Sequence, residues 1–249
     1  MTTRRAAAGL ILGLAAQPAW AVEPAHLLSG GALEPAVSAA LVRWRAQGGG
    51  EVRVDFATAP RIAARLESGE APDLVLAPQG LMEGLSRAGR LAGPPVTLGA
   101  IGVGIALRDD APDPAIRDEA SFRAALLDAD AIVFNRASTG LYVEGLLDRL
   151  GLTAALSART LRFPDGDAVL RRIAGGTGRE IAFAATTEIL LFRQRGVRLA
   201  GPLPGALQNR TLYAAGLLRK ADPNDTARQL LAFLETAASR EAMVAAGVE

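Results

Sequence analysis

The sequence has 249 residues, a formal net charge of +1, 50% hydrophobic residues and no cysteine. A nearly balanced charge excludes the basic surface on which nucleic-acid binding depends. A single histidine without any cysteine excludes a clustered zinc or copper site, and a fold without disulfides must rely on its hydrophobic core.

The first residues have the pattern of a secretory signal peptide. Arg4 and Arg5 precede the apolar run 6–16, and Ala19-Trp20-Ala21 is a small-x-small cleavage site. The apolar run is shorter than the ~20 residues that a membrane-spanning helix needs. We therefore expect residues 1–21 to be removed and the mature chain, with 25 basic and 26 acidic residues, to be a periplasmic protein without stable membrane insertion.

After this segment, short apolar runs alternate with amphipathic helical patterns. Such alternation predicts an α/β fold with mostly parallel sheets. Strands are expected at residues 26–28, 51–56, 73–77, 131–134, 159–163 and 180–184. Helices are expected at residues 33–47, 60–67, 79–88, 121–127, 140–150, 168–174, 187–195, 225–236 and 240–246.

Two longer extended runs, residues 96–108 and 211–219, interrupt this alternation. A chain that crosses into a second α/β lobe and later returns would produce two such strands. We therefore predict one lobe from residues 22–100 plus 208–249, and a second, inserted lobe from residues 101–207. The alternative is a single sheet with two long edge strands.

Four predicted strand-to-helix junctions share one chemical character. Residues 29–32, 57–60, 135–140 and 184–187 place hydroxyls or glycines where a helix begins. In open α/β sheets, ligands bind outside the carboxyl ends of strands, where helix N-termini offer free N–H groups to anions. Ordinary N-capping would select the same residues. Four such junctions, two in each predicted lobe, favour an anion-binding cleft.

Nothing in the sequence predicts a cofactor. The glycines of residues 99–104 have no helix after them, and residues 175–178 lack the Lys-Ser/Thr ending of a P-loop. No Gly-x-Ser-x-Gly elbow is present to supply a hydrolase nucleophile. His26, early in the first strand, is interpreted as a strand residue.

Charged residues near the junctions are harder to assign. Glu144 and Glu188 lie in the first turn of predicted helices, where the helix dipole favours a carboxylate. Asp165 and Asp167 fit turn chemistry. Arg136 lies inside the hydroxyl-rich loop, where it either clamps a carboxylate ligand or projects into solvent.

The segments "LLSGGALEPAV", "FATAPRIAARLESGEAPDLVLAP", "ASTGLY" and "NRTLYAAGLL", in this order after a signal peptide, resemble the periplasmic molybdate-binding protein family of ABC importers. The likeness covers nearly the whole mature chain. It implies a type II periplasmic-binding fold, with two lobes joined by two hinge strands and the ligand between them. The "SGG" and "ASTGLY" loops are similar to a divergent branch that includes aconitate isomerase.

The resemblance also implies site residues. Its two second-loop serines fall on Thr58 and Ala59, its first-loop serine falls on Ala32, and its hinge tyrosine falls on Tyr213. The replacement of two serines by alanine weakens the case for molybdate itself. The expected ligand-binding residues are Ser29, Gly30, Gly31, Thr58, Ala59, Arg136, Ser138, Thr139, Thr186 and Tyr213, with Arg61 added for a carboxylate ligand. No residue is assigned a catalytic or metal-binding role.

These implications lead to a functional expectation. We expect a monomeric substrate-binding protein that captures a small anion, either an oxyanion or an organic acid, by hinge closure and delivers it to an ABC permease in the inner membrane. An aconitate isomerase-like enzyme is the alternative, with Glu188, Asp165 or Tyr142 as the base. An adhesion factor on the same fold is a third reading.

Overall fold

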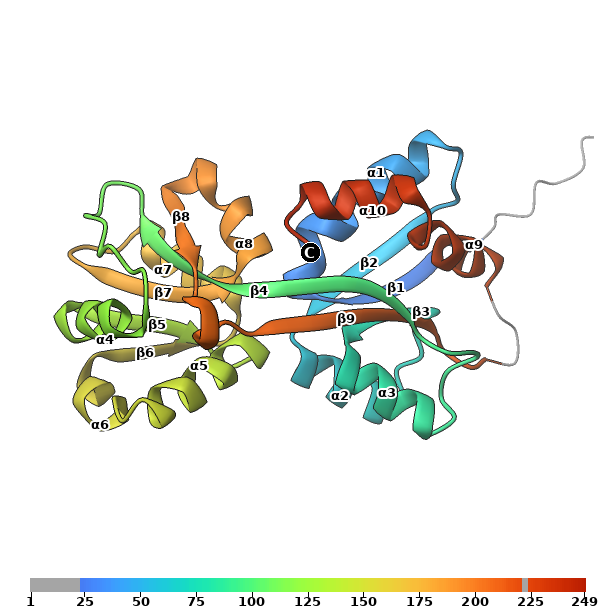
Figure 1. Cartoon of the computed structure of the whole chain (residues 1–249). Helices are drawn as coiled ribbons and strands as arrows, with labels where there is room; N and C mark the ends of the chain where they lie inside the picture. Colours follow the sequence, from blue (N-terminus) through green and yellow to red (C-terminus); the bar gives the residue numbers. More distant parts are fainter. Residues whose placement is uncertain (1–22, 221–223) are drawn as a thin grey trace, which may run out of the picture.

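The computed structural model describes residues 23–220 and 224–249 and shows two α/β lobes side by side (Figure 1). The predicted signal peptide lies outside the described residues. Within these ranges, no helix combines the length and the apolar character needed to cross a membrane.

The first lobe contains a sheet in the order β2-β1-β3-β9-β4. The first three strands are parallel, and β9 pairs antiparallel with both β3 and β4. The strands are β1 (Ala25–Gly30), β2 (Val52–Ala57), β3 (Leu74–Pro78), β4 (Val96–Arg108) and β9 (Arg210–Leu217). The helices are α1 (Glu34–Ala46), α2 (Ala59–Glu67), α3 (Gln79–Arg87), α9 (Asp225–Leu234) and α10 (Ala237–Ala245).

The first lobe has two hydrophobic cores, one on each face of its sheet, because successive strand side chains point to opposite faces. Leu27 packs with α1, α9 and α10 on one face of the sheet, whereas Leu28 packs with α2 and α3 on the other. Successive strand residues point to opposite faces, so a buried strand is apolar at every position. Figure 1 shows α1 and α10 above the sheet and α2 and α3 below it.

The second lobe repeats this design with different connections. Its parallel strands are β5 (Ala131–Asn135), β6 (Thr160–Phe163) and β7 (Glu180–Ala185), and β7 pairs antiparallel with the far half of β4. Helices α4 (Glu119–Asp128), α5 (Ser138–Arg149) and α6 (Thr153–Leu156) contribute to one core. Helices α7 (Gly166–Ala174) and α8 (Thr186–Leu191) contribute to the other.

One strand of this lobe was not predicted from the sequence. β8 (Val197–Pro202) pairs antiparallel with β4, at an edge of the sheet. Its run ends in Gly-Pro, which suggests a turn, and its middle residues are only partly buried. The apolar signal that predicted the other strands is therefore weak here.

Two strands connect the lobes. β4 pairs with β9 up to Gly102, with β7 from Val103 and with β8 from Gly104 onward. At the change of partner, the Gln208 side chain accepts from the Val103 N–H (3.0 Å) and donates to its carbonyl (3.1 Å). The lobes also touch directly, since the Thr187 hydroxyl of α8 donates to the Ala32 carbonyl at 2.6 Å.

Candidate functional site

A cavity of about 260 Å³ lies between the two lobes. It is lined by residues at or just after the carboxyl ends of β1, β2 and β3 from the first lobe and of β5 and β6 from the second. The chain leaves each of these strands to begin a helix, so several helix N-termini face one space. This is the position at which ligands bind in open α/β folds.

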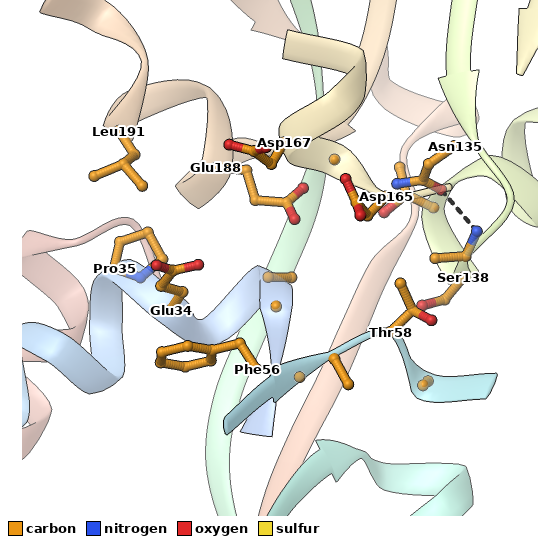
Figure 2. Close-up of a pocket in the computed structure, with 18 of the residues that line it drawn as sticks. Glu34, Pro35, Phe56, Thr58, Asn135, Ser138, Asp165, Asp167, Glu188 and Leu191 are labelled. Carbon is orange, nitrogen blue, oxygen red and sulfur yellow. Dashed lines mark hydrogen bonds between the residues drawn. The ribbon is translucent and has the colours of Figure 1, made fainter. Parts of the chain in front are cut away.

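One side of the cavity carries neutral hydroxyl groups from both lobes. Thr58 precedes α2, whereas Ser138 and Thr139 are the first two residues of α5, and all three line the cavity. Figure 2 shows Thr58 and Ser138 close together on this side, which we call the donor end. Thr58 occupies the N-cap position of α2 but makes no side-chain capping bond. Helix capping, which would explain a threonine at this position without any ligand, therefore does not use its hydroxyl.

A buried asparagine shapes the loop before α5. The Asn135 side-chain oxygen accepts from the N–H groups of Ala137 (3.0 Å) and Gly140 (2.9 Å). A β-carbon at Gly140 would lie 1.7 Å from the Asn135 carbonyl oxygen, so only glycine fits there. The Asn135 hydrogen bonds fix the loop that places Ser138 and Thr139 in the first turn of α5. The sequence analysis did not assign this role to Asn135.

Tyr213 reaches the cavity from the hinge strand β9 and is 5% exposed. Burial of the ring raises the pKa of its hydroxyl, the nearby Glu188 carboxyl adds to this, and a hydrogen bond with the Ser138 side chain opposes it. The hydroxyl therefore stays protonated and can act as a further neutral donor. Tyr142, by contrast, packs on the second-lobe core and donates to the Leu207 carbonyl.

The opposite side of the cavity carries carboxyl groups, of which Glu188 is the central one. Burial raises the pKa of Glu188 to about 7, and the neighbouring Asp165 and Glu34 carboxylates act in the same direction. Within the described part of the chain, one contact opposes this shift: the Ala185 N–H, which donates to one carboxylate oxygen at 3.3 Å. We call this side, shown in Figure 2 with Glu188 beside Asp167 and above Glu34, the acid end.

The other acid-end carboxylates have partners or solvent. Asp165 caps α7 by accepting from the Ala168 N–H at 2.9 Å. Asp167 pairs with Arg171, and Glu34 is exposed. Turn and capping chemistry, as expected from the sequence, therefore accounts for Asp165.

Seven of the ten predicted site residues line the cavity: Gly30, Gly31, Thr58, Ala59, Ser138, Thr139 and Tyr213. Ser29 does not, because it is fully buried in β1 and its hydroxyl donates to the Gly30 carbonyl. Arg136 is exposed and does not line the cavity, nor does Thr186. Arg61, expected for a carboxylate ligand, lines the cavity from an exposed position.

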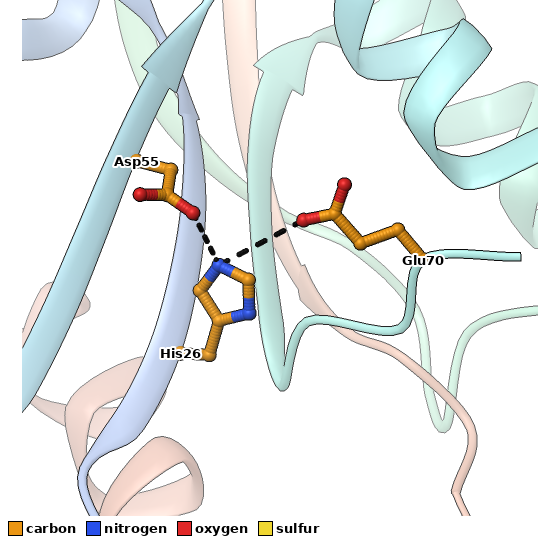
Figure 3. A group of neighbouring side chains, drawn as sticks. All are labelled: His26, Asp55 and Glu70. Atoms are coloured by element: carbon orange, nitrogen blue, oxygen red, sulfur yellow. Dashed lines mark hydrogen bonds and ion pairs between the residues drawn. The ribbon is translucent and has the colours of Figure 1, made fainter. Parts of the chain in front are cut away.

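A second group of polar side chains lies at the far end of β1, where His26, Asp55 and Glu70 approach one another (Figure 3). His26 Nε2 is 2.8 Å from Asp55. The Arg65 guanidinium donates to both carboxylates, and it thus supplies the positive charge that a metal ion would bring. The pKa of Asp55 is lowered, mainly by the hydrogen bond with His26 and also by Arg65. The pKa of Glu70 is lowered mainly by its hydrogen bonds with Arg65. His26 itself is a β1 residue, as predicted.

Comparison with known proteins agrees with this architecture. The family model described as bacterial extracellular solute-binding protein matches residues 25–249. The chain belongs to this family.

The proteins that resemble this solute-binding protein include an enzyme and two anion-binding proteins. An aconitate isomerase from Pseudomonas sp is 27% identical over 249 residues, covering 95% of this chain and 92% of that one. The periplasmic molybdate-binding protein of Azotobacter vinelandii has a TM-score of 0.74 at 17% identity, covering 90% and 98% of the two chains. A sulfate-binding protein of Mycobacterium tuberculosis has a TM-score of 0.70 at 16% identity, covering 90% and 86%.

These matches confirm the resemblance and the fold that it implied. The chain has the two-lobed periplasmic-binding fold, and the likeness to the molybdate-binding family holds at the level of fold and family. The solved structures are too distant in sequence to assign a ligand.

Proposed function

We propose that this solute-binding protein is periplasmic, encloses a small organic acid in the cleft between its lobes and delivers it to an ABC permease. One observation carries the proposal: hydroxyls and helix N-termini from both lobes converge on one cavity, and the Thr58 hydroxyl is not used for capping. Unpaired N–H groups and neutral hydroxyls stabilise an anion without burying a counter-charge.

The size and charge of the cavity favour an organic acid over a compact oxyanion. Its volume of about 260 Å³ is below the usual range of drug-sized sites, so the ligand is small. Four carboxyl side chains line it: Glu34, Asp165, Asp167 and Glu188. They repel any anion, but an extended organic acid can place an acid group at the donor end, away from them, whereas a compact dianion such as molybdate cannot separate its charges in this way. Alanine stands at positions 32 and 59, where the molybdate-binding family has serines. Arg136 is exposed and does not line the cavity, so it offers no guanidinium to the ligand, whereas Arg61 lines the cavity and favours a carboxylate.

Hinge closure would complete the site. The two connecting strands permit the lobes to move relative to one another, and the Thr187-to-Ala32 hydrogen bond joins them beside the cavity. Contacts of this kind, together with a ligand held by both lobes, stabilise the closed arrangement.

A ligand screen tests the proposal. Purified protein would be heated with molybdate, tungstate, sulfate, phosphate, citrate, malate, succinate and the aconitates, because a tight ligand raises the Tm by mass action. We expect a carboxylic acid to give the largest shift. Binding of an oxyanion alone would overturn the organic-acid assignment, and binding of none would overturn the anion-binding function.

A second function is favoured by one specific observation, the position of Glu188 in the cavity with a pKa near 7. A base in this range can take a proton from the carbon beside a substrate carboxylate, after which the double bond shifts and the same carboxyl returns a proton to the other end. The 27% identical aconitate isomerase is consistent with such chemistry. Incubation of cis- and trans-aconitate with the protein, followed by NMR, decides the matter, since an absence of interconversion rules out this activity.

A further inference from the structure

The two ends of the cavity differ in a way that constrains the ligand further. The donor end presents hydroxyls that can donate to an acid group. The acid end presents Glu188, which is partly exposed and whose Oε1 has no hydrogen-bond partner among the residues that the structure describes. Each of the other acid-end carboxylates is capped, paired or open to solvent. Glu188 is therefore the carboxyl that is available to a ligand.

The structure makes a place for this carboxyl group. A β-carbon at Gly166 would lie 2.2 Å from Glu188 Oε2, and one at Gly31 would lie 3.9 Å from Oε1. Gly31 belongs to the first lobe and Gly166 to the second, so the group is held where the lobes meet. The charged groups that act on it, Asp165 and Glu34, are both negative, and Tyr213 is also close.

A carboxyl in this position needs a hydrogen-bond donor. Glu188 is partly exposed to the open cleft, and closure of the lobes on a ligand would remove the water that reaches it. In its ionised form it would then lack a donor, and an acid with only carboxylate oxygens offers acceptors alone. A ligand hydroxyl or ammonium group would supply the missing donor. An ammonium group would also offset the negative charges around Glu188.

We propose that the ligand is a small acid that also carries a hydroxyl or ammonium group, with its acid group at the donor end and its donor group on Glu188. This inference rests on the proposed function, because it assumes that the cavity binds an organic acid. It adds the second functional group and names the residue that selects it.

Matched acids test the assignment by titration calorimetry. Succinate, L-malate and L-aspartate share a four-carbon dicarboxylate and differ at one carbon, which carries hydrogen, hydroxyl or ammonium. Tricarballylate and citrate, and propionate, lactate and alanine, extend the comparison to other sizes. In at least one series we expect the donor-bearing acid to bind tenfold or more tightly than its donor-free counterpart.

Variants then assign the preference to Glu188. Glu188→Met removes the acceptor and should reduce the preference at least tenfold, whereas Glu188→Gln keeps an acceptor and should reduce binding of the ammonium acid more than that of the hydroxy acid. Glu67→Met, an exposed position outside the cavity, serves as the matched control and should keep the wild-type preference. Circular dichroism would verify that each variant is folded.

The outcomes separate this inference from the function on which it rests. Equal binding of donor-free and donor-bearing acids, or a preference that survives Glu188→Met, overturns the inference and leaves the binding function intact. Binding of none of these acids, with no shift from any oxyanion, overturns both.

Discussion

The two ends of the cleft use different physical means to face a ligand. The donor end relies on hydroxyls and helix N-termini, which carry only partial charges and remain satisfied by solvent when no ligand is bound. The acid end holds a carboxyl against the backbone of Gly166, with no cation among the groups that shift its pKa. We expect the first arrangement to tolerate many anions and the second to be selective, because Glu188, partly exposed in the open cleft, would need a hydrogen-bond donor once a ligand displaces solvent.

The largest effect is expected from a change that displaces the carboxyl. In Gly166→Ala the new methyl would displace the Glu188 carboxyl, so ligand affinity should fall by 100-fold or more, whereas stability should fall by no more than about 1 kcal/mol, because the end of this flexible side chain can rotate away. Calorimetry and chemical denaturation measure the two quantities. In a Glu188→Ala background, the same Gly166→Ala change should cost much less stability, since the obstructing group is gone.

Gly80→Ala is the matched control for this substitution. Gly80 is exposed in α3, and no atom lies within 4 Å of its added β-carbon. We expect it to leave binding unchanged and to stabilise the protein by about 0.5–1 kcal/mol, because alanine favours a helix over glycine. Equal costs for both substitutions would indicate that Gly166 does not make room for Glu188.

The pH dependence of stability sharpens the comparison next. A carboxyl whose folded-state pKa lies near 7, above its usual value of 4.5, binds its proton more tightly in the folded state. Its contribution is therefore favourable below about pH 4.5 and declines as pH rises toward 7. At pH 8 the folded protein must hold Glu188 in its unfavourable ionised form. Glu188→Gln removes this cost, so the variant should be more stable than the wild type at pH 8 by about 2–3 kcal/mol. The gain should shrink by about 2 kcal/mol at pH 5.

Thermal unfolding at the two pH values measures this difference. Each kcal/mol corresponds to roughly 2–4 °C in Tm for a chain of this size. The exposed control Glu67→Gln should change stability by no more than about 0.5 kcal/mol at either pH. A stability gain for Glu188→Gln that is the same at pH 5 and pH 8 would be inconsistent with a carboxyl whose pKa is raised in the folded state.

The strands show which parts of the fold could be predicted from the sequence. Parallel strands buried on both faces read as continuous apolar runs, and every such run that was expected to be a strand is one. The partly exposed edge strand β8 lacks that signal and was missed. The strands β2 and β6 are also partly exposed and were predicted, so exposure alone does not explain the miss. The strand β8 differs from them in ending with Gly-Pro, which reads as a turn.

The site was less predictable because its properties depend on contacts between distant segments. Ser29 and Thr58 both follow short apolar runs, yet strand geometry buries Ser29 and places Thr58 at the cavity. Glu188 looked like a helix-dipole residue, and its one backbone contact, with Ala185, does fit that role. The role that we propose for it depends on Gly31 and Gly166, which lie beside its carboxyl but are distant in sequence, so no local pattern could reveal it.

At the donor end, single substitutions should have moderate effects. Ser138→Ala or Thr58→Val each removes one neutral hydroxyl, so each should weaken binding of the best acid from the ligand screen about five- to tenfold, or about 1–1.4 kcal/mol. Ser157→Ala, an exposed serine outside the cavity, is the control. If both donor-end variants bind as tightly as wild type, the hydroxyls do not contact the ligand.

The smallest effect is expected far from the cleft, where carboxylates have the cation that Glu188 lacks. Arg65 contacts Asp55 and Glu70 and lowers the pKa of each, the reverse of the shift at Glu188. Arg65→Met should reduce stability at pH 7 by about 1 kcal/mol or less, because Asp55 is 38% exposed and solvent screens the pair. Carboxylates with lowered pKa stabilise the fold above their unfolded values, so the difference from wild type should vanish as pH falls toward 3. Ligand affinity should stay at the wild-type value, and a loss as large as that of the donor-end variants would show that the two ends of β1 are coupled.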